Sequence, residues 1–99
     1  MKIQWSPLAL ERASECIAYI AEDKPAAAET WIHELFERVD LLTSTPYMGR
    51  VVPELSNARY REILLGNYRV IYSIKDEHIE ILTIRGVRQI LASEKFDYR

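Results

Sequence analysis

The chain has 99 residues, of which 48% are hydrophobic and 10% aromatic, with only three glycines and four prolines. This composition predicts a single folded domain over residues 1–99 and excludes a disordered or low-complexity chain. No apolar run approaches the roughly 18 residues that cross a bilayer, and the N-terminus lacks the apolar core of a secretory signal. A single cysteine cannot form an internal disulfide, so we expect a cytoplasmic protein with no membrane partner.

The formal net charge of −2 is unevenly distributed along the chain. Residues 1–49 carry four basic and eight acidic side chains, whereas residues 50–99 carry nine basic and seven acidic ones. Seven of those nine are arginines, whose planar donors suit phosphate or carboxylate: Arg50, Arg59, Arg61, Arg69, Arg85, Arg88 and Arg99. Gathered on one face they would bind an anionic partner, and scattered they would form ordinary solvated strand surfaces.

The first half of the chain reads as a strand followed by two helices. Alternation over residues 2–6 predicts a short strand, and Ser6-Pro7 reads as an N-cap followed by the first residue of a helix that runs to about Glu22. Asp23-Lys24-Pro25 ends this helix and opens a second one, with Asp23 at or near its N-cap. Because the break is so short, the two helices must form an antiparallel hairpin.

The second half reads as a long loop followed by strands. Residues 43–58 contain two prolines, a glycine and several hydroxyl residues, with one extended piece at Arg50–Val52. Residues rich in Ile, Val, Leu and Tyr then predict three strands, at Tyr60–Leu65, Tyr68–Lys75 and Ile79–Arg85. The expected fold class is α+β, in the order β-α-α-β-β-β, with the helical hairpin packed on a small antiparallel sheet.

Two finer features follow from the same strands. Gly66-Asn67 joins the first two, and glycine at the first central position favours a type II′ turn. After Gly86 the chain leaves the sheet, and Val87–Lys95 is expected to form a short helix or an ordered tail.

Arg69 is the residue of greatest chemical interest, because it lies on the middle strand and points to the face opposite Tyr68, Val70 and Tyr72. Two interpretations remain open. Arg61 and Arg85 converge with Arg69 into a cationic surface, or Arg69 forms a buried ion pair with Glu62 or Glu80.

Familiar catalytic and metal-binding patterns are missing from the sequence. His33 and His78 stand alone, with no second histidine or cysteine at ligand spacing, so we expect neither a metal nor a cofactor. Cys16 lies on the apolar stripe of the first helix and is expected in the core. No glycine-rich phosphate loop follows a strand.

Five segments, in this order along the chain, resemble the RelE/ParE superfamily of bacterial toxins: Trp5–Ala9, Ile17–Pro25, Pro46–Arg50, Tyr60–Ile63 and Gly66–Tyr72. The resemblance covers nearly the whole chain, and the β-α-α-β-β-β fold that it implies agrees with the fold predicted from the residue pattern.

The resemblance implies the toxin of a type II toxin–antitoxin pair, but it leaves the target open. RelE-like members are ribonucleases that cut messenger RNA on the ribosome, and ParE-like members inhibit DNA gyrase. Both are neutralised by a cognate antitoxin encoded beside them, and we expect contact with operator DNA only through that antitoxin. In a RelE-like enzyme, the resemblance places Arg69 at the cleaved phosphate, with Arg61, Arg85 and Tyr98 as the other candidate catalytic residues.

The sequence departs from the ribonuclease pattern in ways that favour the ParE-like branch. The first hairpin strand lacks lysines, no histidine follows the last strand, and the isoelectric point of about 5.7 is poorly suited to binding ribosomal RNA. We therefore expect gyrase inhibition, with five candidate binding residues: Arg59, Arg61, Arg69, Arg85 and Arg88. The alternatives are a ribosome-dependent ribonuclease and a degenerate member retained for antitoxin binding or transcriptional control.

Overall fold

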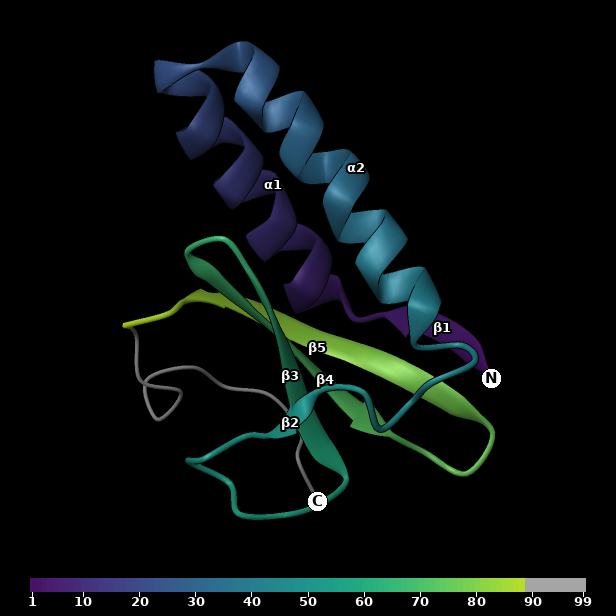
Figure 1. The fold of residues 1–99 in the computed structure, drawn as a ribbon. Coiled ribbons are helices and arrows are strands. Elements are labelled where there is room, and N and C mark those ends of the chain that lie inside the picture. The colour runs from purple at the N-terminus through teal and green to yellow at the C-terminus, as the bar shows by residue number, and fades with distance from the viewer. Residues whose placement is uncertain (89–99) are drawn as a thin grey trace.

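The computed structural model describes residues 1–88 (Figure 1). Most of the predicted short helix or tail over Val87–Lys95, from residue 89 on, lies outside the described residues. The candidate residue Tyr98 and the predicted surface arginine Arg99 lie outside them too. The elements are, in chain order, β1 (Lys2–Trp5), α1 (Pro7–Asp23), α2 (Pro25–Leu41), β2 (Arg50–Val51), β3 (Tyr60–Leu65), β4 (Tyr68–Ile74) and β5 (His78–Gly86). The predicted helices and strands are confirmed to within one residue at each end, and the two-residue β2 lies at the predicted extended piece.

The strands form one five-stranded sheet in the order β1-β5-β4-β3-β2. The predicted antiparallel meander of β3, β4 and β5 is confirmed, and β1, for which the sequence predicts no partner, pairs with β5 in parallel, so the sheet is mixed. Alternation along a strand reports which face is buried and says nothing of its partner, and here the partner lies more than 70 residues away. A hydrogen bond of 3.0 Å from the amide of Ser6 to the carbonyl of Ile81 extends this pairing into the start of α1.

The β3–β4 turn has the predicted geometry. Gly66 has a φ of +60° and Asn67 has no positive φ, which is the combination expected of a type II′ turn. A Cβ on Gly66 would meet no atom within 4 Å, so glycine is needed there for its backbone conformation alone.

Local chemistry sets both helix starts. Ser6 caps α1 through its Oγ, which accepts a hydrogen bond of 3.0 Å from the amide of Ala9, and Pro7 follows at the first helical position. The N-cap of α2 is Lys24, one residue after Asp23, which is still the last residue of α1. Lys24 serves as C-cap of α1 and N-cap of α2 at once, which leaves no separate position for a capping side chain.

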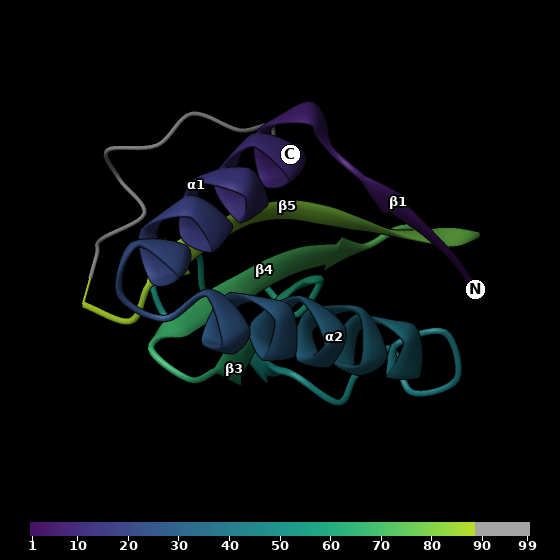
Figure 2. The same cartoon turned by 90° about the horizontal axis from the view of Figure 1, so that it is seen from above.

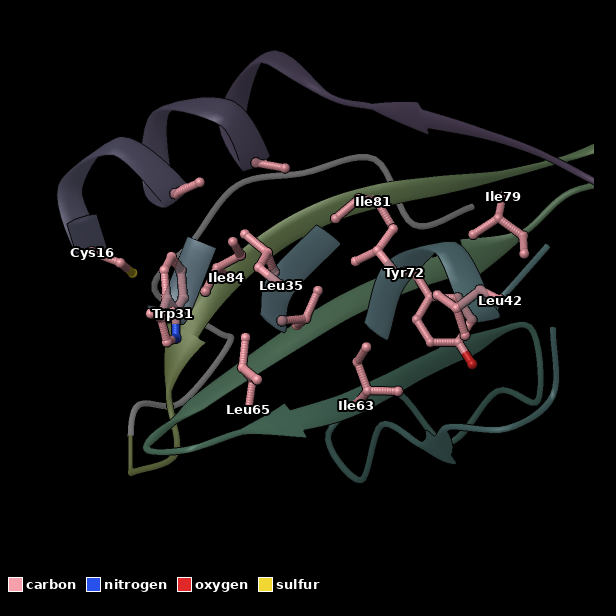
Figure 3. Close-up of a cluster of buried hydrophobic side chains, with 14 of the residues drawn as sticks. Cys16, Trp31, Leu35, Leu42, Ile63, Leu65, Tyr72, Ile79, Ile81 and Ile84 are labelled. Carbon is pink, nitrogen blue, oxygen red and sulfur yellow. The ribbon is translucent and has the colours of Figure 1, made fainter. Parts of the chain in front are cut away.

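Both helices cover the same face of the sheet, where the main core forms (Figures 2 and 3). Leu35 of α2 packs there with Ile63, Tyr72 and Ile81 of the sheet, each 5% exposed or less. Cys16 belongs to this core, as predicted, and burial, followed by the charge of Glu15, raises the pKa of its thiol to about 11. Neither helix within residues 1–88 is long and apolar enough to span a membrane.

The other face of the sheet is covered differently. The connection between β2 and β3 packs Val52 and Leu55 against Tyr60, Ile71 and Leu82, so the predicted long loop is an ordered cover. All four polar or charged residues that are buried within residues 1–88 lie on sheet strands on this side: Glu62, Arg69, Ser73 and Thr83.

Candidate functional site

Arg69 lies at the centre of this polar face and is only 4% exposed. Its Nε donates a hydrogen bond of 2.8 Å to Oε1 of Glu62 on the neighbouring strand β3. Its two terminal nitrogens bind both oxygens of Glu54, from the β2–β3 connection, at 2.8 and 2.6 Å. The hydrogen bonds to Glu54 raise the pKa of Arg69 above its ordinary value. Burial opposes this rise, and Glu62 adds to it. The guanidinium is therefore a permanent cation held by two carboxylates.

Glu62 continues the charge cluster towards the sheet edge. Its side chain has no exposed surface, and its second oxygen accepts a hydrogen bond of 2.6 Å from Nε of Arg50 in β2. Glu54, Arg69, Glu62 and Arg50 thus alternate in sign and sum to zero formal charge. We call these four residues the ion cluster. They tie the β2–β3 connection and the edge strand to the centre of the sheet.

The predicted buried ion pair is present, with Glu62 as the partner of Arg69. Sequence reasoning missed Glu54, which supplies the bidentate contact. No periodicity marks Glu54, because it lies in an irregular segment 15 residues before Arg69.

The predicted convergence of three arginines is wrong. Arg85 is the direct cross-strand neighbour of Arg69, so these two share a face. Arg61 instead pairs with Tyr72, which lies in the core under the helices, so Arg61 belongs to the opposite face. A two-residue turn at 66–67 already fixes this parity, since it pairs residues 65 and 68 and therefore residues 61 and 72.

Two of the remaining predicted binding residues are exposed and are not members of the ion cluster. Arg59 is near Asp76, with 3.8 Å between Nη2 and Oδ1, and both side chains are largely in solvent. Arg88 is exposed in the turn that follows β5. The structure therefore spreads the predicted arginine set over several surfaces.

Tyr72 explains the glycine in the Pro46–Arg50 segment. Its hydroxyl accepts a hydrogen bond of 3.0 Å from the amide of Gly49 and donates one of 2.7 Å to the carbonyl of Pro46. Burial raises the pKa of this hydroxyl, so it stays neutral and able to donate. A Cβ on Gly49 would lie 2.6 Å from the carbonyl oxygen of Glu62 and 2.7 Å from the Tyr72 hydroxyl, so only glycine fits.

Arg61 holds the same segment from the outside. Its Nε donates to the carbonyl of Ala58 at 2.9 Å, and its Nη1 donates to the carbonyls of Gly49 at 2.9 Å and Tyr47 at 3.3 Å. The guanidinium carbon lies 4.9 Å from the centre of the Tyr47 ring, in a cation–π arrangement. Arg61, Tyr72 and the ion cluster therefore fix the course of the chain from Pro46 to Ala58.

Comparison with known proteins agrees with this architecture. The family model for the ParE toxin of the type II toxin–antitoxin system parDE matches residues 3–91. A Sinorhizobium fredii protein named "Putative toxin Y4kP" is 34% identical over 90 residues, covering 89% of this chain and 90% of that protein. A solved structure described as the chromosomal ParDE TA system from P. aeruginosa shares the fold, with a TM-score of 0.70 and 20% identity, over 87% of this chain and 95% of that chain. With a family model matched over most of its length, the chain belongs to the ParE toxin family of type II toxin–antitoxin systems.

Proposed function

We propose that this ParE-family toxin arrests growth by binding and inhibiting DNA gyrase, and that a cognate antitoxin neutralises it. Family membership supports a toxin with an antitoxin partner. The surroundings of one residue, Arg69, support gyrase rather than the ribosome as the target.

Arg69 is poorly placed to bind a reacting phosphate. Its Nε and both terminal nitrogens already donate to carboxylates at 2.6–2.8 Å, and only 4% of the residue is exposed. RNA cleavage needs cationic stabilisation of the phosphate and a positioned acid and base. An incoming phosphate would have to displace Glu54 and approach the carboxylate of Glu62. The arrangement favours an inhibitor that works through its surface.

A pair of assays on the purified toxin tests this proposal. We expect cleaved DNA to accumulate when gyrase and plasmid are incubated with the toxin, and protein synthesis to continue in a coupled translation reaction at the same toxin concentration. Cut messages and arrested translation, with gyrase unaffected, would establish the ribosome-dependent alternative instead.

The antitoxin contact is proposed to involve the exposed cations that the structure leaves at the surface. Arg59 and Arg88 suit an acidic, amphipathic antitoxin segment that adds a helix or strand to the domain. Contact with operator DNA is expected only through the antitoxin. Co-expression of a short acidic protein encoded beside the toxin should restore growth, and operator DNA should be retained by the complex but not by the toxin alone.

A further inference from the structure

Two large apolar side chains are exposed at the tip of the segment that joins α2 to β2. Tyr47 is 61% exposed and Met48 is 44% exposed. We call these two residues the tip. Single exposed apolar residues are common, so exposure by itself does not indicate a function.

The backbone around the tip is fixed on both sides, which is unusual for an exposed loop. Pro46 and Gly49 flank it and share the hydroxyl of Tyr72 as a hydrogen-bond partner. The amide of Met48 donates to the carbonyl of Thr45 at 3.1 Å, and the Thr45 hydroxyl lies 3.8 Å from the Met48 sulfur. The carbonyl of Tyr47 accepts from Arg61. The tip is therefore preorganised, and a partner that binds it need not order a flexible loop.

Arg61 gives the tip a positive charge. Its hydrogen bonds within the described residues go to carbonyl oxygens, and no carboxylate there lies within ion-pair distance of it. This differs from Arg50, which pairs with Glu62, and from Arg69, which pairs with Glu54 and Glu62. Because the Arg61 guanidinium rests against the Tyr47 ring, the charge and the apolar surface form one unit.

We propose that the tip, with Arg61 beside it, is the surface through which this toxin binds its protein target. Tyr47 and Met48 would enter an apolar pocket of the target, and a carboxylate at the pocket rim would face Arg61. Tyrosine, methionine and arginine are enriched at the centres of protein interfaces, and preorganised aromatic anchors carry much of the binding energy. The inference rests on the proposed function in requiring a protein target, but it does not require that target to be gyrase.

A nucleic acid is the less suitable occupant. Arg61 already lies against the Tyr47 ring, which limits stacking by a base, and the net charge of −2 disfavours a phosphate chain. The Met48 side chain adds apolar surface that a base does not need.

The test uses the full chain with Tyr47→Ala and Met48→Ala combined. We expect growth inhibition and gyrase inhibition to weaken roughly tenfold or more, since interface anchors commonly cost that much when truncated. The melting temperature should stay close to that of wild type, because neither side chain is buried in the core. Tyr19→Ala is the matched control, since Tyr19 is 71% exposed on α1, and it should inhibit like wild type.

A second pair of substitutions guards against a folding effect. Met48→Glu places a negative charge where the partner is expected to be apolar and acidic, so it should abolish inhibition in a folded protein. Met48→Leu preserves the apolar volume and should retain it.

The outcomes separate this inference from the proposed function. If the double variant inhibits gyrase as strongly as wild type does, gyrase inhibition stands and the tip is not the contact surface. If wild type arrests growth without affecting gyrase and the double variant does not arrest growth, gyrase is the wrong target and the tip stands. A wild-type toxin that affects neither growth nor gyrase would overturn both. If the wild-type toxin binds a single-stranded RNA oligomer and the double variant does not, the tip is a nucleic-acid surface and the inference of a protein contact is overturned.

Discussion

Glu62 binds two arginines, of which one is buried and the other exposed. Its side chain is fully buried, and it accepts hydrogen bonds from the buried Arg69 and from Arg50, whose side chain is 59% exposed. A buried carboxylate in this position is retained at a desolvation cost that only its partners offset. The ion cluster is therefore sensitive to the loss of any one member.

Glu62→Gln removes the negative charge between two cations. We expect the free energy of unfolding to fall by about 3–5 kcal/mol, because a buried arginine is left partly uncompensated. Urea unfolding followed by circular dichroism measures the change. The double variant Glu62→Leu with Arg69→Leu should recover part of the loss, and a double variant that is only additively worse would show that the two residues are not coupled.

Gly49→Ala tests the close approach of the loop to the sheet. The added methyl group would overlap the Glu62 carbonyl and the Tyr72 hydroxyl, so we expect a loss of about 1–3 kcal/mol in stability. Gly66→Ala is an informative comparison, since it meets no atom and suffers only from its positive φ. An unchanged urea midpoint for Gly49→Ala would contradict the packing described for this segment.

Cys16 gives a prediction for alkaline pH. Burial raises the pKa of its thiol from 9.0 in the unfolded chain to about 11 in the fold. The contribution to stability is present below pH 9 and is lost as the pH rises from 9 through 11, because the unfolded chain ionises first. Unfolding free energies measured from pH 8 to 11 should therefore fall more steeply for wild type than for Cys16→Ala. Parallel curves would exclude the effect.

At the scale of elements, the connection from α2 to β3 covers the face of the sheet that lies opposite the helices. Tyr72 is a core residue that also reaches this connection, where it joins Pro46 to Gly49. The segment resembling the family motif at Pro46–Arg50 thus has a structural explanation in this chain, and its exposed residues are left available for contact.

Tyr72→Phe removes the hydroxyl and nothing else. Since it leaves the Gly49 amide without its partner, we expect a loss of about 1–3 kcal/mol and faster hydrogen exchange at Gly49. Tyr19→Phe, at an exposed position of α1, should change neither. Unchanged exchange at Gly49 in Tyr72→Phe would mean that this hydroxyl does not hold the segment.

The elements were largely predictable because their signals are local. Pro7 and Pro25 mark the helix starts, and Gly66 marks the hairpin turn. The parallel pairing of β1 and the contact between Glu54 and Arg69 are set by tertiary packing, which leaves no periodic signal in the sequence. The length of the turn at 66–67 sets the face of the sheet on which Arg61 lies, but this follows only when the strand pairs are counted outward from the turn.

At the scale of the whole molecule, the two faces of the sheet have different roles. One is covered by helices and forms the apolar core, and the other carries the ion cluster under the β2–β3 connection. The arginines that could have formed one surface for an anionic partner are divided between the two faces of the sheet and separate exposed positions. For a toxin of the ParE family, this division supports action by protein contact.

We propose that Arg69 stabilises the fold and takes no direct part in toxicity. Arg69→Lys keeps the charge but cannot bind Glu54 and Glu62 through the same set of donors. Gyrase inhibition by this variant, expressed per folded molecule, tests the claim most directly. We predict a lower melting temperature with inhibition within about twofold of wild type, since the exposed contact surface is unchanged. An unchanged melting temperature with inhibition lost would contradict the account.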